Sequence, residues 1–172
     1  MKFFLIKLFF FFSFTGLAIA NENIRFININ YIINNSEVGK SLNKLIENKN
    51  KQIQTELKKI SEKLEKDKNK IVNQKNVLKK EEFDELAKNY DDKVKKFNQT
   101  KKTRTAEFNQ FRINSKKKII DTLNPIITNF LKKESIQILL QKDKIIFGDE
   151  KLDITKEILD IFNKKHKKLK FE

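Results

Sequence analysis

The sequence has no cysteine and no tryptophan, and its 172 residues include a single proline, three glycines and a single histidine. Without cysteine there is neither a disulfide nor a thiolate ligand for a metal. The few glycines leave no glycine-rich loop that could cradle a phosphate. The lone histidine, His166, lies in a lysine-rich segment, and no pair of ligand-type residues has metal-binding spacing. The chain is therefore not expected to be an enzyme, and no catalytic residue, cofactor or metal is predicted.

The scarcity of glycine and proline is concentrated in one region. The 85 residues from Lys40 to Asn124 contain neither residue, although these two break helices most strongly. A helix of a globular protein averages about 11–12 residues. So long an uninterrupted segment predicts either a single helical rod or a rod folded back into a hairpin.

Apolar side chains recur every seven residues in both halves of this segment, which is typical of paired helices. The first half contains the rows Ile46, Ile53, Ile60 and Leu57, Leu64, Ile71, Leu78. The second half contains the rows Phe83, Tyr90, Phe97, Phe111 and Ala87, Val94, Phe108. The phase changes between the halves, which favours an antiparallel hairpin over residues 37–124 with its tip near 75–85. Asp67 and Gln74 occupy positions where an apolar residue is required, so we expect a looser distal half.

The hairpin also carries most of the charge. The formal net charge of the chain is +15, and residues 40–118 hold 24 basic against 12 acidic side chains. Such a surface is either a solvated helix face or a means of attracting acidic partners. Anionic membrane or a lipopolysaccharide surface is a further partner that this charge allows.

The first twenty residues have the features of a secretory signal peptide. Lys2 and Lys7 precede an apolar segment at 8–17, and Ala18-Ile19-Ala20 supplies a small-residue cleavage pattern. We expect cleavage after Ala20 and export to the periplasm. A retained anchor is the alternative, but the apolar segment is shorter than the roughly 18 residues that span a bilayer. Export also removes nucleic acid as an expected partner.

The remaining residues, 21–36 and 125–172, predict a small β body, which makes the fold class mostly α. Strands are expected near 24–30, 135–141 and 144–148, followed by a C-terminal helix near 155–164. Asn124-Pro125 is expected to interrupt the helix where the arm enters the body, with Pro125 either a helix terminus or a hinge. Residues 164–170 form a basic tail that we expect to be mobile.

So small a body buries little core, so its exposed strand edges are expected to associate with other chains. The candidates for this oligomer contact are Ile24, Phe26, Ile29, Ile136, Ile138, Leu140, Ile145 and Phe147.

The order of these parts resembles the Skp/OmpH family of periplasmic chaperones. The resemblance depends on the first strand at 24–29, on Val38-Gly39-Lys40 at the base of the hairpin, and on residues 136–159 with Leu152-Asp153-Ile154-Thr155. It implies a homotrimer in which three helical arms project from a joint β body around a cavity. It also implies a holdase that keeps unfolded outer-membrane β-barrel proteins in that cavity without ATP.

The aromatic row has two open interpretations: its side chains either fill the seam between the helices or contact client. The candidates for client contact are Phe83, Tyr90, Phe97, Phe108, Phe111, Lys101, Lys102 and Arg104. The alternative function is a structural coiled-coil spacer or adaptor of the cell envelope.

Overall fold

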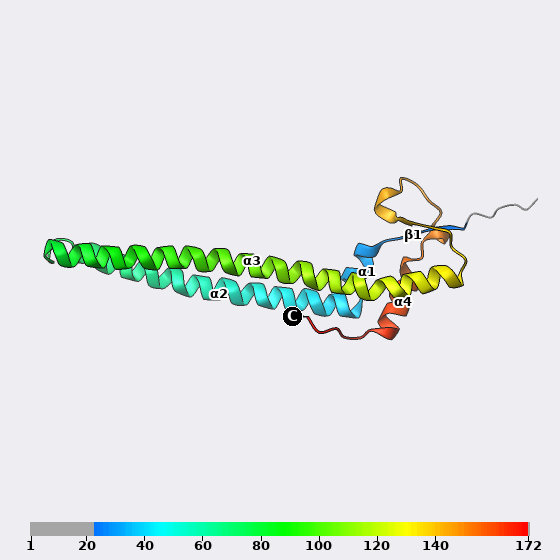
Figure 1. Cartoon of the computed structure of the whole chain (residues 1–172), viewed down its shortest axis with the longest axis horizontal. Coiled ribbons are helices and arrows are strands. Elements are labelled where there is room, and N and C mark those ends of the chain that lie inside the picture. The colour runs from blue at the N-terminus through cyan, green and yellow to red at the C-terminus, as the bar shows by residue number, and fades with distance from the viewer. Residues whose placement is uncertain (1–22, 172) are drawn as a thin grey trace, which may run out of the picture.

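The structure, a computed structural model, describes residues 23–171; the expected signal peptide lies outside these residues. A long helical hairpin projects from a small body, and the C-terminal segment runs from this body back along the base of the arm (Figure 1). The elements follow in the order β1 (Ile24–Ile27), α1 (Ile29–Asn35), α2 (Glu37–Gln74), α3 (Lys80–Lys133), β2 (Ile138–Gln141) and α4 (Thr155–Lys165). No helix of the described part is long and apolar enough to cross a membrane.

Helices α2 and α3 run antiparallel, which confirms the hairpin over the single rod (Figure 1). Helix α2 begins after Ser36, whose Oγ accepts a hydrogen bond of 3.0 Å from the N–H of Gly39 and so caps the first turn. Its 38 residues reach about 57 Å at 1.5 Å per residue. Residues 75–79 form the turn at the tip.

Helix α3 is continuous through Pro125, so the expected interruption at Asn124-Pro125 is wrong. Proline in a helix interior costs about 3 kcal/mol, because it lacks an N–H and its ring crowds the preceding turn. The neighbouring Leu123, Ile126 and Ile127 are buried in the core, and this burial offsets the cost. Pro125 is therefore not a helix terminus, and its role as a hinge stays a prediction.

The sheet has two parallel strands. In its register Ile24 of β1 pairs with Ile138 of β2, and Ile27 pairs with Gln141. On the opposite side of β1, Phe26 forms an isolated parallel bridge with Asp153. Strand β1 ends earlier than expected because Asn28 caps α1, its side chain accepting from the N–H of Tyr31 at 2.8 Å.

The strand expected at 144–148 is absent, and this prediction is wrong. Residues Lys142–Lys144 form a 3₁₀ turn, and the chain beyond it has no strand conformation. The side chains of Ile146 and Phe147 are 105% and 92% exposed. The apolar pattern of this segment is typical of a strand, but no neighbouring strand of the same chain lies beside it to supply hydrogen bonds.

The core lies where the base of the hairpin meets α1 and α4. Its fully buried side chains include Ile32 of α1, Val38 of α2, Ile119 of α3 and Phe162 of α4. Beyond Leu42, α2 has no buried residue, so the arm is held by its seam alone. The core thus fixes the arm at its base and leaves most of the arm in solvent.

Residues 164–170 were expected to be mobile, and the structure contradicts this prediction. Leu169 and the adjacent Phe171 are partly buried against the core cluster. The chain after α4 runs back towards the arm (Figure 1). The sequence did not indicate this packing, because Leu169 and Phe171 are the only apolar residues at 164–171 and lie among lysines.

Candidate functional site

The aromatic row lies along the seam of the arm. Phe83, Tyr90, Phe97 and Phe108 are partly buried, and Phe111 near the base is 8% exposed. The opposing row of α2, with Ile53, Leu57, Ile60 and Leu64, is likewise partly buried. A pair of helices has no second layer to cover the seam, so these apolar side chains remain accessible along the arm's edges.

One access to the seam is a groove in the middle of the arm, which we call the mid-arm groove. It has a volume of about 440 Å³ and an apolar floor of Ile60, Leu64 and Phe97. The lysines that line it are Lys59, Lys63, Lys93 and Lys96, and Asp67 is its acidic member. An apolar floor with a basic rim suits a chain segment that offers both apolar and acidic groups.

A second groove of about 230 Å³ lies nearer the body and brings Phe108, Phe111 and Arg104 together. The Lys49 ammonium lies 4.7 Å from the centre of the Phe111 ring, a cation–π contact. Arg104 extends across the hairpin to Glu56 at 3.3 Å and along its own helix to Glu107 at 3.2 Å. These hydrogen bonds raise the pKa of the Arg104 guanidinium, which stays charged.

One further polar pair crosses the seam. The Lys93 ammonium donates to a carboxylate oxygen of Asp67 at 2.7 Å. This hydrogen bond lowers the pKa of Asp67 below its ordinary value. The acidic residue that interrupts the heptad row thus faces a lysine of the other helix, and the polar position is matched across the arm.

Lys101 and Lys102 are exposed on another part of α3. They line a shallow surface with Asn98 and Thr105, apart from the residues that line the two grooves. The structure therefore brings Arg104 to the aromatic row but leaves these two lysines on a separate face.

The candidates for oligomer contact divide into two groups. Phe26 is buried within the chain, and Ile24, Ile29, Ile136 and Ile145 are partly buried. Ile138 and Leu140 of β2 are 44% and 43% exposed, and Phe147 is almost fully exposed beside Ile146. Within residues 23–171, β2 pairs with β1 alone, so its other edge is open. Ile138 and Leu140 of the exposed group belong to the strand that has this open edge, and Phe147 lies in the segment that follows it in the chain.

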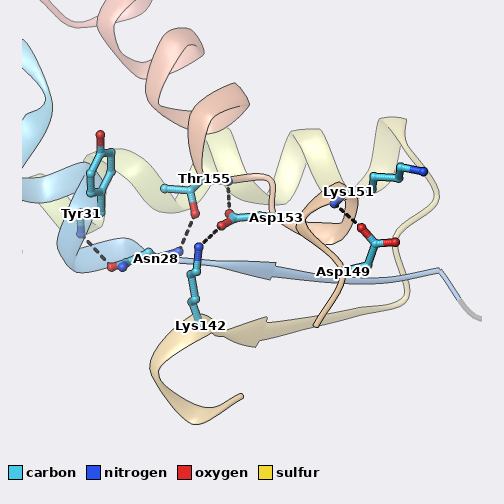
Figure 2. A network of polar contacts seen from close by, with 7 residues as sticks. All are labelled: Asn28, Tyr31, Lys142, Asp149, Lys151, Asp153 and Thr155. Carbon is cyan, nitrogen blue, oxygen red and sulfur yellow. Dashed lines mark hydrogen bonds and ion pairs between the residues drawn. The ribbon is translucent and has the colours of Figure 1, made fainter. Parts of the chain in front are cut away.

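A polar network holds the segment that carries this edge (Figure 2). The Lys142 ammonium donates to Asp153 at 2.6 Å, and the other carboxylate oxygen accepts from the N–H of Thr155 at 2.9 Å. The Thr155 hydroxyl oxygen accepts from the N–H of Asn28 at 2.8 Å. Burial alone would raise the pKa of Asp153, but these hydrogen bonds outweigh it and lower the pKa. The network ties β1, β2 and the start of α4 together.

Sequence reasoning missed the exposed Ile146 and the Asp67–Lys93 pair. Ile146 belongs to the strand predicted near 144–148, and the strand pattern does not indicate that its side chain is exposed. Asp67 was noticed as a break in the row, and a basic residue at the facing position of the second half would have been the signal to seek. Among the described residues, no group of three or more potential ligands could hold a metal ion.

These features define a class of protein in which a basic two-helix arm with accessible apolar grooves projects from a small body with an open sheet edge. The family model described as Outer membrane protein (OmpH-like) matches residues 23–162, and the chain belongs to this family.

Among solved structures, the chain is similar to a proposed outer membrane chaperone (OmpH-like) from Caulobacter crescentus CB15. The two are 16% identical and superpose with a TM-score of 0.82, over 89% of this chain and 90% of the other. At this identity the likeness establishes the shared fold. No curated protein matches the chain at a significant level.

Proposed function

We propose that this protein is an ATP-independent holdase of the periplasm, which cages unfolded outer-membrane β-barrel proteins between helical arms and prevents their aggregation. Membership of the OmpH-like family and the chaperone description of the structural match support a chaperone role. The observation that carries the proposal is the mid-arm groove, in which an apolar floor is rimmed by lysines along a solvent-exposed arm.

The chemistry of the arm suits weak and reversible binding. Its apolar side chains are half-exposed rather than gathered in a deep pocket, so no single contact fixes one bound conformation. Several arms around one client would raise the effective concentration of these contacts. Release would follow when the client folds, because folding hides the apolar segments that the arms bind.

The proposed assembly is a homotrimer joined at the bodies. The open edge of β2 and the exposed Ile138, Leu140 and Phe147 support it, since unpaired strand edges readily pair with another chain. The segment at 144–148 would gain a strand partner in such an assembly. The proposed localisation follows from the expected signal peptide, and no cofactor or enzymatic activity forms part of the proposal.

The test dilutes a urea-denatured β-barrel membrane protein into buffer with and without this protein, and follows aggregation by light scattering. We expect scattering to be suppressed without ATP, and the mass of the complex to correspond to three copies with one client. A chain that stays monomeric and leaves aggregation unchanged would contradict the proposal. Recovery of one folded partner in fixed stoichiometry would instead support the structural spacer.

The basic surface is tested separately. Lys101→Ser with Lys102→Ser removes two exposed charges from the arm, and Lys132→Ser with Lys144→Ser removes two exposed charges from the body. If the arm attracts acidic client, the arm variant alone will require more protein for the same protection at low salt. Raised salt should narrow the difference between the arm variant and the body variant in the amount of protein required. Salt screens exposed charges over about 10 Å at 0.1 M.

A further inference from the structure

Helix α4 is followed by a C-terminal segment that packs back on the molecule. The family model matches residues 23–162, and α4 runs on to Lys165. We call residues 163–171 the strap. In Figure 1 the part of the strap beyond Lys165 leaves the end of α4 and runs back towards the base of the arm. Its sequence alternates basic residues with the two apolar residues Leu169 and Phe171.

The strap is fastened at three points. The side-chain oxygen of Asn163 accepts a hydrogen bond of 2.9 Å from the N–H of Glu37, the first residue of α2. The His166 ring lies against the fully buried Phe162, with 5.5 Å between ring centres. Leu169 and Phe171 are partly buried against the core cluster, while Lys167, Lys168 and Lys170 are exposed. An alternation of buried apolar and exposed basic side chains indicates a docked segment.

One fastening point lies at the start of α2, at the base of the arm. Helix α3 passes from arm to body without interruption. Helix α2 is joined to the body only through its first turns, where Val38 and Leu42 are buried, and its later residues contact the seam. Any swing of the arm relative to α1 and α4 must therefore strain the first turns of α2. The Asn163–Glu37 hydrogen bond connects α4 directly to this point.

We propose that the strap is a restraint that couples α4 to the base of the arm and limits how far the arm can swing. Without the strap, α2 would be held there by α1 and the core contacts alone. The strap would thereby set the spread of the arms and so the range of clients that fit between them. This consequence rests on the proposed function, whereas the restraint itself can be measured without any client.

The first experiment is hydrogen–deuterium exchange on the full chain. The test variant is Leu169→Ser with Phe171→Ser, and the matched control is Lys168→Ser with Lys170→Ser, which changes two exposed residues of the same segment. We expect amides of residues 37–46 to exchange about tenfold faster in the test variant, because exchange reports the free energy of local opening. The control, and residues 83–100 in both variants, should match the unchanged chain.

Global destabilisation is separated by a milder variant. Asn163→Ala removes only the side-chain acceptor for Glu37, and it should also accelerate exchange at 37–46, by a smaller factor. Equal exchange at 37–46 in all variants would overturn the proposal. Faster exchange of every segment in the double variant, with no change in Asn163→Ala, would also overturn it.

The second experiment measures the swing itself. Because the chain has no cysteine, Asn76→Cys at the tip and Lys156→Cys on α4 can carry a pair of spin labels. The labelled chain is diluted with unlabelled chain, so that distances within one chain dominate. We expect the distance distribution to broaden in the Leu169→Ser, Phe171→Ser variant and to stay unchanged in the lysine control. An unchanged width in both would show that the strap does not restrain the arm.

Discussion

The carboxylate of Asp67 on α2 lies 2.7 Å from the ammonium of Lys93 on α3, at a position of the seam where the heptad pattern requires an apolar side chain. If the helices slid past one another by a turn, Asp67 and Lys93 would separate. Each charge would then be uncompensated or would face an apolar neighbour. Arg104 and Glu56 form a second pair of this kind nearer the body. The two pairs therefore specify the register of a seam that is otherwise repetitive.

The first prediction exchanges the charges of this pair. Asp67→Lys places two ammonium groups together and should lower the melting temperature of the protein, measured by circular dichroism. Adding Lys93→Asp restores an opposite pair and should recover most of the loss. Asp67→Leu should raise the melting temperature, because it completes the apolar row. A swap that recovers nothing would contradict the role of the pair in register.

The heptad rows and the absence of glycine and proline predict the hairpin, because the periodicity of a two-helix seam is a local property of the sequence. Asp67 shows the limit of this reasoning, since its partner is fixed only once the tip closes and aligns the helices. Pro125 shows another, because the burial of Leu123 and Ile126 overrides its preference for a helix end. The segment at 144–148 has the composition of a strand, but strand formation needs a neighbour that the single chain does not supply.

The strap shows a third limit. Leu169 and Phe171 are separated by lysines, and a pattern of two apolar residues in a basic segment is also typical of solvated tails. Their burial depends on the core surface, which is assembled from side chains of α1, α2, α3 and α4. This surface exists only in the folded chain. The heptad rows predict that the aromatic side chains lie at or near the seam. The lysines that line the two grooves depend on how the two helices face each other, which the closed hairpin determines.

The second prediction concerns Gly39 in the first turn of α2. A Cβ atom at this position would lie 1.6 Å from the carbonyl oxygen of Ile33, which belongs to the backbone of α1. Because a backbone atom cannot move aside without moving the helix, Gly39→Ala should cost about 2–4 kcal/mol of the free energy of unfolding, measured in urea. Gly148→Ala is the matched control. Its Cβ would lie 2.9 Å from Cε1 of Phe26, a side-chain atom at a longer distance than the backbone oxygen near Gly39, so the cost should be smaller.

The third prediction is a stabilising change at Ser135. This residue follows α3 with φ of 52°, in the left-handed region. The N–H of Ile136 donates to the carbonyl oxygen of Leu131 at 2.9 Å, which completes the helix-ending motif that favours glycine here. Ser135→Gly should therefore raise the free energy of unfolding by about 1 kcal/mol, measured in urea. Ser135→Val should lower it, and a valine variant as stable as the glycine variant would contradict the argument.

The fourth prediction is a pH dependence that arises from Asp153. Its pKa is lowered below the ordinary value of 3.8 in the folded protein, so folding favours the charged form. The stabilisation is fully present above pH 3.8 and is lost as the pH falls from there through the folded pKa. Asp153→Asn should therefore reduce the free energy of unfolding at neutral pH by about 1–3 kcal/mol, because it weakens charge-assisted hydrogen bonds.

The difference between the Asp153→Asn variant and the unchanged chain should narrow as the pH falls below 3.8. Asp143→Asn, which removes an exposed carboxylate from the same segment, should cost little at any pH. A constant difference for Asp153→Asn across the acid range would contradict the linkage to its ionisation.

The last prediction tests what the exposed apolar group of the body is for. Phe147, in the segment that follows β2, is 92% exposed, and Val77 is 81% exposed at the tip of the arm. Both are exposed apolar side chains outside regular structure, but only Phe147 lies at the proposed contact between bodies. Phe147→Asp should shift the mass measured by light scattering from three copies towards one, because a buried unpaired carboxylate opposes association. Val77→Asp should leave the mass unchanged. If both variants, or neither, alter the mass, the bodies are not joined through the surface that Phe147 occupies.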